Sequence, residues 1–177
     1  MTSDHDVALA MALVEEACRK SALVWLRPLG ARYAVPAWHV FTAGAVHVVG
    51  GGIEQNLPEM AAGGGGDEVE VTVRSKDNGG RLLTFRATVT RVPPDSEAWA
   101  TVVPELHAKR LNPPDGERQP QRWAQESTVL RLEATGRLVE SPGHPSHRSH
   151  AAEPPGSPAT TRGPLPFVVG RRARRRR

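Results

Sequence analysis

Residues 33–56 read Y-A-V-P-A-W-H-V-F-T-A-G-A-V-H-V-V-G-G-G-I-E-Q-N, and this stretch decides the fold. Apolar side chains alternate along its first half, and Thr42-Ala43-Gly44 then forms a short turn in which Gly permits a positive φ. The return strand, residues 45–49, is apolar apart from His47, which predicts that both of its faces are covered. It ends in three glycines, and glycines let another group approach the backbone closely. The stretch therefore predicts one extended hairpin with a glycine-bearing exit.

Residues 67–92 predict a second hairpin. Val69, Val71 and Val73 alternate with polar residues, as in a strand with one buried face. Asp77-Asn78-Gly79-Gly80 follows as a tight turn, since Asn and Gly tolerate the left-handed backbone conformation. Residues 81–92 form the longest predicted strand.

The remaining elements are shorter. We expect a helix over residues 7–20, a strand over 21–27, a helix over 97–111, a helical turn over 120–124 and a last strand over 127–133. Six antiparallel strands with few flanking helices favour a closed or half-open barrel, because closure removes exposed sheet edges.

The charge is unevenly distributed. Residues 1–136 contain 14 Lys and Arg against 17 Asp and Glu, a net charge of −3, whereas residues 137–177 contain 9 against 2, a net charge of +7. The second segment also contains seven prolines and ends in R-R-A-R-R-R-R. We therefore expect a folded domain over 1–136 and a disordered, basic C-terminal tail over 137–177. The mildly acidic domain argues against a nucleic-acid-binding protein as a whole.

Several other classes have little support. The single cysteine, Cys18, cannot form an internal disulfide and has no polar cluster near it in sequence. No apolar run approaches the roughly 18 residues of a membrane span, and Asp4 and Asp6 are atypical of a secretory signal, so we expect a cytoplasmic protein. His144, His147 and His150 recur every three residues among Pro, Ser and Gly, which would make only a loose metal site. No metal site and no catalytic side chain is therefore predicted.

Two segments carry a resemblance to a known family: P-A-W-H-V-F-T-A-G-A-V-H-V-V-G-G-G and V-E-V-T-V-R-S-K-D-N-G-G-R-L-L-T-F-R-A-T-V. Together with the order of elements over residues 5–135, they resemble the flavin-binding split-barrel proteins, which include pyridoxamine 5'-phosphate oxidase-like proteins and deazaflavin-dependent reductases. The resemblance implies a six-stranded antiparallel split barrel, mainly β with flanking helices. It also implies a homodimer that binds flavin mononucleotide (FMN) or a deazaflavin between its subunits.

The resemblance also implies a set of cofactor-binding residues. The first hairpin and its glycine exit would face the isoalloxazine ring and the phosphate, and the second hairpin would add cations. The candidates are Trp38, His39, Gly50, Gly51, Gln55, Asn56, Arg74, Lys76 and Arg86. Glu54 departs from the family pattern, because an acid stands there where a cation would help. Each candidate also has a structural alternative: core packing for Trp38, a backbone hydrogen bond for His39, turn formation for Gln55 and Asn56, and an exposed face for the three cations.

Three functions remain open from the sequence. The first is an FMN- or deazaflavin-dependent oxidoreductase acting on a small molecule, in which the cofactor carries the electrons. The second is a cofactor-free dimeric barrel, or a small-ligand-binding protein without redox activity. The third is association with nucleic acid through the arginine-rich tail, which could equally have no dedicated role.

Overall fold

The computed structural model describes residues 4–58, 60, 68–154 and 156. The three helices with regular α geometry are α1 (Asp4–Lys20), α2 (Glu97–Lys109) and α3 (Gln119–Glu126), and a 3-10 turn, η1 (Gly116–Arg118), precedes α3. The strands are β1 (Leu23–Pro28), β2 (Val35–Trp38), β3 (Val40–Thr42), β4 (Ala45–Gly50), β5 (Glu68–Arg74), β6 (Arg81–Arg91) and β7 (Thr128–Glu140). No helix of the described part is long and apolar enough to cross a membrane.

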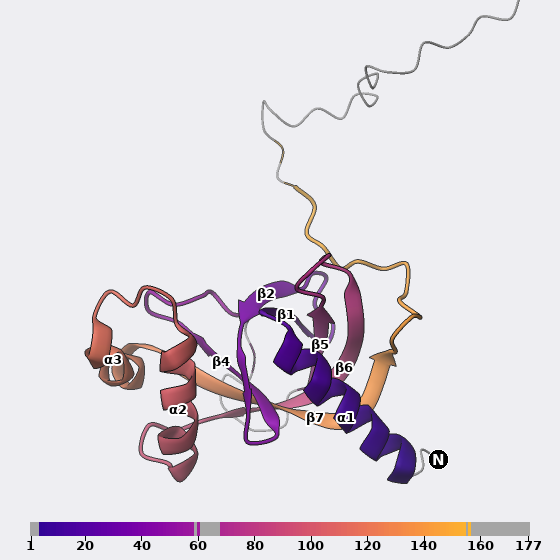
Figure 1. Ribbon diagram of the computed structural model, residues 1–177. Helices are drawn as coiled ribbons and strands as arrows, with labels where there is room; N and C mark the ends of the chain where they lie inside the picture. The colour runs from indigo at the N-terminus through magenta and orange to yellow at the C-terminus, as the bar shows by residue number, and fades with distance from the viewer. Residues whose placement is uncertain (1–3, 59, 61–67, 155, 157–177) are drawn as a thin grey trace, which may run out of the picture.

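The seven strands form one antiparallel sheet with the order β2-β1-β5-β6-β7-β4-β3. The strands at the two ends of this order, β2 and β3, are consecutive in the chain and are separated only by His39. The sheet therefore curls until its ends meet along one chain segment, which gives a half-barrel (Figure 1). The mainly β class with flanking helices is confirmed.

The prediction of six strands is wrong, because the first strand of the expected hairpin changes partner at His39. β2 pairs with β1, whereas β3 pairs with β4 through the two-residue turn Ala43-Gly44, where both residues have positive φ. A His39 ring nitrogen lies 3.1 Å from the Cys18 carbonyl oxygen at the end of α1, which ties the break to the helix. Only the β3–β4 half of residues 33–56 is a hairpin.

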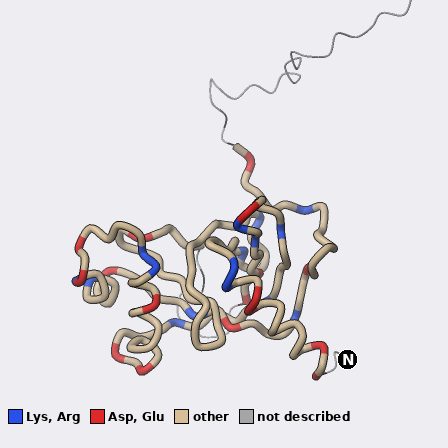
Figure 2. Tube along the Cα trace, viewed as in Figure 1, with Lys and Arg blue, Asp and Glu red and all other residues tan. Residues whose placement is uncertain are grey.

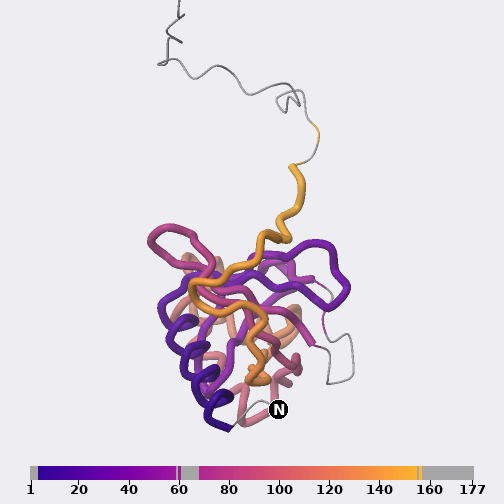
Figure 3. Tube along the Cα trace, turned by 90° about the vertical axis from the view of Figure 1, so that its right-hand side faces the viewer, coloured from indigo at the N-terminus to yellow at the C-terminus, as the bar shows by residue number. Residues whose placement is uncertain are grey.

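The prediction of a disordered tail from residue 137 is also wrong at its start. β7 continues to Glu140, because Gly136 adopts φ +79° within an irregular stretch of the β6–β7 pairing instead of ending the strand. Residues 141–151, called here the strap, then run back over the sheet (Figure 3). The terminal arginines, and residues 157–177 as a whole, lie outside the described residues.

Two apolar layers stabilise the fold. Inside the half-barrel, the inward residues of the strands pack against one side of α1, which contributes Val14, Ala17 and Cys18. On the outside of β3, β4 and the start of β7, α2 and α3 cover a second cluster that includes Val49, Val103 and the fully buried Trp123. None of the helices in the described part of the chain lies over the outer face of β1, β5 and β6 (Figure 1), and this face carries the polar alternate residues of those strands.

Candidate ligand pocket

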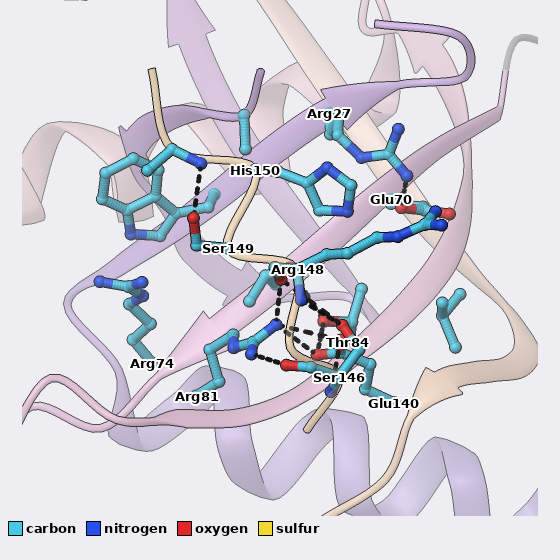
Figure 4. A pocket seen from close by; sticks show the side chains of 15 residues that line it. Arg27, Glu70, Arg74, Arg81, Thr84, Glu140, Ser146, Arg148, Ser149 and His150 are labelled. Carbon is cyan, nitrogen blue, oxygen red and sulfur yellow. Dashed lines mark hydrogen bonds and ion pairs between the residues drawn. The ribbon is translucent and has the colours of Figure 1, made fainter. Parts of the chain in front are cut away.

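A pocket of about 420 Å³ lies on this outer face, between the sheet and the strap (Figure 4). Strand alternation places polar and aromatic side chains there, because their neighbours in sequence point into the barrel core. The volume falls in the usual range for small-molecule sites. The sheet contributes Trp25, Arg27, Glu70, Thr72, Arg74, Arg81, Thr84, Val139 and Glu140, the β1–β2 loop contributes Ala34, and the strap contributes Ser146, Arg148, Ser149, His150 and Ala151.

Arg81, the first residue of β6, joins the strap to the sheet. Its Nη1 donates to both carboxylate oxygens of Glu140, at 3.0 and 3.2 Å, and to the Arg148 carbonyl oxygen at 2.7 Å. Its Nη2 donates to the Ser146 carbonyl oxygen. The Ser146 N–H in turn donates to Glu140 at 3.0 Å. A hydrogen bond between backbone groups, from the Ala34 N–H to the His150 carbonyl oxygen at 2.9 Å, fixes the far end of the strap.

The pocket is more basic than acidic: four arginines line it against two glutamates. Arg27 is paired with Glu70, and Arg81 is paired with Glu140. Arg74 instead lies over the Trp25 ring at 5.0 Å, and neither Arg74 nor Arg148 has a carboxylate partner within the described part of the chain. Both acidic and basic positions gather where the strap passes over the sheet (Figure 2). Two guanidinium groups are therefore free to bind an anion.

Glu140 remains ionised in this setting. Burial alone would raise the pKa of its carboxyl, but hydrogen bonds from Ser146 and Thr84 and the charge of Arg81 outweigh that effect and hold the pKa below its usual value. A carboxylate at Glu140 keeps Arg81 oriented toward the strap carbonyls.

The nine predicted cofactor residues fall into two separate groups. Arg74 lines the pocket, and Arg86 lies beside it, paired with Glu70 at 3.0 Å. Lys76 is exposed in the turn between β5 and β6. The other six, Trp38, His39, Gly50, Gly51, Gln55 and Asn56, belong to the region between the β2–β3 break and the glycine exit, and none of them lines this pocket.

At the glycine exit, several candidates have structural partners. The Gln55 side chain accepts from the Trp38 N–H at 2.8 Å and donates to the Trp38 carbonyl at 3.1 Å, so it substitutes for a neighbouring strand. A Cβ at Gly50 would lie 2.6 Å from the Leu57 side chain. Gly51 has φ +89° and packs against the Glu126 carbonyl, where a Cβ would lie 3.4 Å away. Asn56 is exposed.

Glu54 is buried between two arginines rather than exposed at an anion site. Its carboxylate accepts from Arg110 Nε at 2.8 Å and from Arg122 Nη2 at 2.9 Å, and its side chain is fully buried. Burial raises its pKa, but hydrogen bonds from Arg122 and Arg110 and the charge of Arg110 lower it by more, so the net pKa is below the ordinary value. Glu54, which departs from the family pattern in sequence, therefore belongs to an ion cluster that joins the segment after β4 to α2 and α3.

The sequence interpretation missed most of the pocket. Trp25, Arg81, Arg148 and His150 were not among the candidates. Outward alternation on residues 23–27 is the signal that could have placed Trp25 on this face. Arg81 has the same strand parity as the core residues Leu83 and Phe85, and it reaches the pocket only because the β5–β6 register shifts between Val73 and Arg74. No local signal marks Arg148 and His150, because they reach the pocket only through the return of the strap.

Comparison with known proteins shows a similarity of fold. No protein-family model and no curated protein matches the chain. Among solved structures, the chain is similar to HutZ, described as a heme storage protein from Vibrio cholerae, with 17% identity and a TM-score of 0.51 over 74% of this chain and 93% of HutZ. It also matches ChuZ of Campylobacter jejuni, with 13% identity and a TM-score of 0.47 over 72% of this chain and 53% of ChuZ. The likeness to HutZ supports the split-barrel fold, whereas membership of the FMN-binding family is not confirmed.

Proposed function

We propose that the protein is a split-barrel binding protein for a flat, anionic cofactor, and that heme is the ligand of the pocket beneath the strap. The observation that carries the proposal is the combination of an aromatic surface, Trp25, with two arginines, Arg74 and Arg148, that have no carboxylate partner among the described residues. A flat ring with carboxylate or phosphate groups is the chemistry that such a lining recognises.

Heme fits this lining for a further reason. His150 lines the pocket, and histidine is a common axial ligand of heme iron. The two heme propionates would be held by Arg74 and Arg148, and the strap would exclude water from one face of the ring. HutZ, which shares the fold, is described as a heme storage protein, and this supports the choice of ligand.

FMN is the competing ligand, since it also combines a flat ring with an anionic group. FMN-dependent oxidoreductase activity would follow only from FMN uptake. In this alternative, FMN would bind at the glycine exit, among Trp38, His39, Gly50, Gly51, Gln55 and Asn56. The positive charge would then have to come from the second hairpin, from Arg74, Lys76 and Arg86. The homodimer expected from the resemblance is compatible with FMN binding and with heme binding alike. A barrel without cofactor is the remaining alternative.

The test is a titration of the full chain with hemin and, separately, with FMN, followed by absorbance. We expect a shifted and sharpened hemin band with saturable binding, and no uptake of FMN. Arg74→Glu should weaken hemin binding by about tenfold or more, because one charge-assisted hydrogen bond is lost and an acid replaces it. Lys76→Glu, an equal charge change at an exposed position outside the pocket, is the matched control and should have little effect.

Three results would count against the heme proposal. FMN uptake without hemin uptake would favour the flavoprotein alternative, and uptake of neither would favour a cofactor-free barrel. Equal loss of hemin affinity in both charge variants would show that net charge, not the pocket, controls binding. Gel filtration of the same samples would report whether the protein is a homodimer.

A further inference from the structure

The pocket is incomplete without the strap. Five of its lining residues, Ser146, Arg148, Ser149, His150 and Ala151, come from the strap, including one of the two free guanidinium groups and the histidine. Any ligand that uses these groups binds only the state in which the strap is docked on the sheet. The contacts that dock the strap therefore belong to the binding mechanism as much as the lining does.

Most of the charge-assisted docking converges on one side chain. Arg81 contacts two strap carbonyls, those of Ser146 and Arg148, as well as Glu140. Its side chain is 18% exposed and that of Glu140 is 10% exposed, so these contacts are largely shielded from water. The ion pair further along, Arg32 with Glu153, is 3.5 Å long, and both of its side chains are more than 70% exposed. Such an exposed pair contributes little.

We propose that Arg81 is a positioning residue that docks the strap and thereby makes the pocket competent to bind its ligand. It does not need to touch the ligand. It holds the backbone on both sides of residue 147, and so it sets where the Arg148 and His150 side chains can reach; Figure 4 shows the strap and its side chains held over the sheet at this point. The part of this inference that concerns the ligand rests on the proposed function.

The geometry requires arginine rather than any cation. The planar guanidinium presents several N–H donors in a fixed fork, and here the fork serves a carboxylate on one strand and two carbonyls on the strap at once. A lysine ammonium retains the charge next to Glu140 but cannot span all three acceptors. Docking should therefore depend on the shape of the side chain as well as its charge.

Ligand binding and strap docking should be coupled in both directions. If a ligand binds only the docked state, it stabilises that state, and a variant that weakens docking lowers the apparent affinity by the fraction of docked molecules it removes. This coupling separates a positioning role from a purely structural one, because global stability need not change.

The experiment measures strap docking and ligand affinity separately on the full chain. Amide hydrogen exchange of residues 141–151 is recorded without ligand, and hemin affinity is measured by absorbance titration, for wild type, Arg81→Gln and Arg81→Lys. The control is Arg91→Gln at the other end of β6, where the arginine donates to Thr128 at 2.9 Å outside the pocket. We expect exchange in the strap to be about tenfold faster and hemin binding about tenfold weaker in Arg81→Gln, intermediate values in Arg81→Lys, and wild-type values in Arg91→Gln.

A second variant covers the case in which Arg81→Gln does not fold. Ser146→Pro removes the N–H that donates to Glu140 without altering the barrel, and it should also speed exchange in the strap. Unchanged strap exchange in Arg81→Gln, or in Arg81→Lys and Ser146→Pro where Arg81→Gln does not fold, would overturn the docking role. Faster exchange with unchanged hemin affinity would overturn the positioning role. If wild type does not bind hemin, the proposed function fails, and the exchange data still decide whether Arg81 docks the strap.

Discussion

His47, in the middle of β4, is completely buried, and neither ring nitrogen has a well-formed hydrogen bond to any described residue. Burial lowers the pKa of its imidazole to about 4, and the nearby charge of Arg131 lowers it in the same direction. The unfolded chain has the ordinary pKa near 6.5, so the folded state favours the neutral ring. The stability contributed by this difference is fully present above pH 6.5 and is lost as the pH falls toward 4.

We therefore predict that the free energy of unfolding decreases between pH 6.5 and 4. The part of this decrease that is due to His47 is on the order of 2–3 kcal/mol. His47→Leu should flatten the pH profile of urea unfolding in this window. His144→Gln, a change at an exposed position outside the core, is the control and should leave the profile as in wild type. A wild-type slope in His47→Leu would mean that His39, whose pKa burial also lowers, is responsible instead.

The residue scale also shows why polar candidates were difficult to assign from sequence. Gln55 has the amide donors and acceptors that a ligand phosphate or ring edge would use, and its local sequence resembles a turn equally well. Its actual partner is the backbone of Trp38, at an edge of the sheet. That choice depends on where β2 ends relative to β4, which local patterning does not define.

At the scale of elements, β7 depends on a single glycine. Gly136 has φ +79°, and a Cβ there would lie 2.8 Å from Cγ1 of Val7 on α1. We predict that Gly136→Ala destabilises the protein by about 1–3 kcal/mol, because alanine in this conformation is strained and its methyl group displaces α1. The measurement is the midpoint of urea unfolding.

The matched control for this prediction is Gly30→Ala. Gly30 has nearly the same φ, +81°, but nothing lies within 4 Å of a Cβ there, so only the backbone strain applies. Gly136→Ala should therefore cost more than Gly30→Ala, and adding Val7→Ala should recover part of the excess. Equal costs at both glycines would show that contact with α1 is not involved.

Elements with a strong local pattern were predicted well, and elements that depend on distant contacts were not. Alternation and the Asn-Gly turn suffice for β5 and β6, and their pairing confirms that hairpin. A short turn over residues 42–44 was likewise expected, and the structure has it at Ala43-Gly44, with Thr42 ending β3. The break at His39 and the continuation of β7 through Gly136 were missed, because each is set by contact with α1, which follows from tertiary packing alone.

At the scale of the whole molecule, the pocket forms because the strap, residues 141–151, runs back over the outer face of the sheet. Arg81 contacts carbonyls 65 and 67 positions further along the chain, and composition alone assigned those positions to a tail without structure. Arg74 was among the candidates because the resemblance implied cofactor-binding cations on the second hairpin. The strap residues were not, since Pro, Ser and Gly leave no periodicity from which a docking face could be inferred.

The same scale gives a prediction for the residues beyond the strap. Deleting residues 157–177 removes seven arginines and no acid, which changes the net charge from +4 to −3. Every residue that lines the pocket lies at or before Ala151, so we expect the melting temperature and the hemin affinity to be unchanged. Any affinity of the full chain for duplex DNA should fall sharply, because the basic segment would supply the phosphate contacts.

The measurement pairs a hemin titration with DNA binding at two salt concentrations, and residues 137–156 are kept because they include the end of β7 and the strap. A salt-dependent DNA affinity that survives the deletion would place nucleic-acid binding in the barrel, against the net negative charge of that part. A loss of hemin affinity would mean that the pocket extends past the strap. Retained hemin binding with lost DNA binding would separate the two activities along the chain. Arg27 and Arg81 are paired with Glu70 and Glu140, and the two remaining pocket arginines are too few to hold a phosphate backbone.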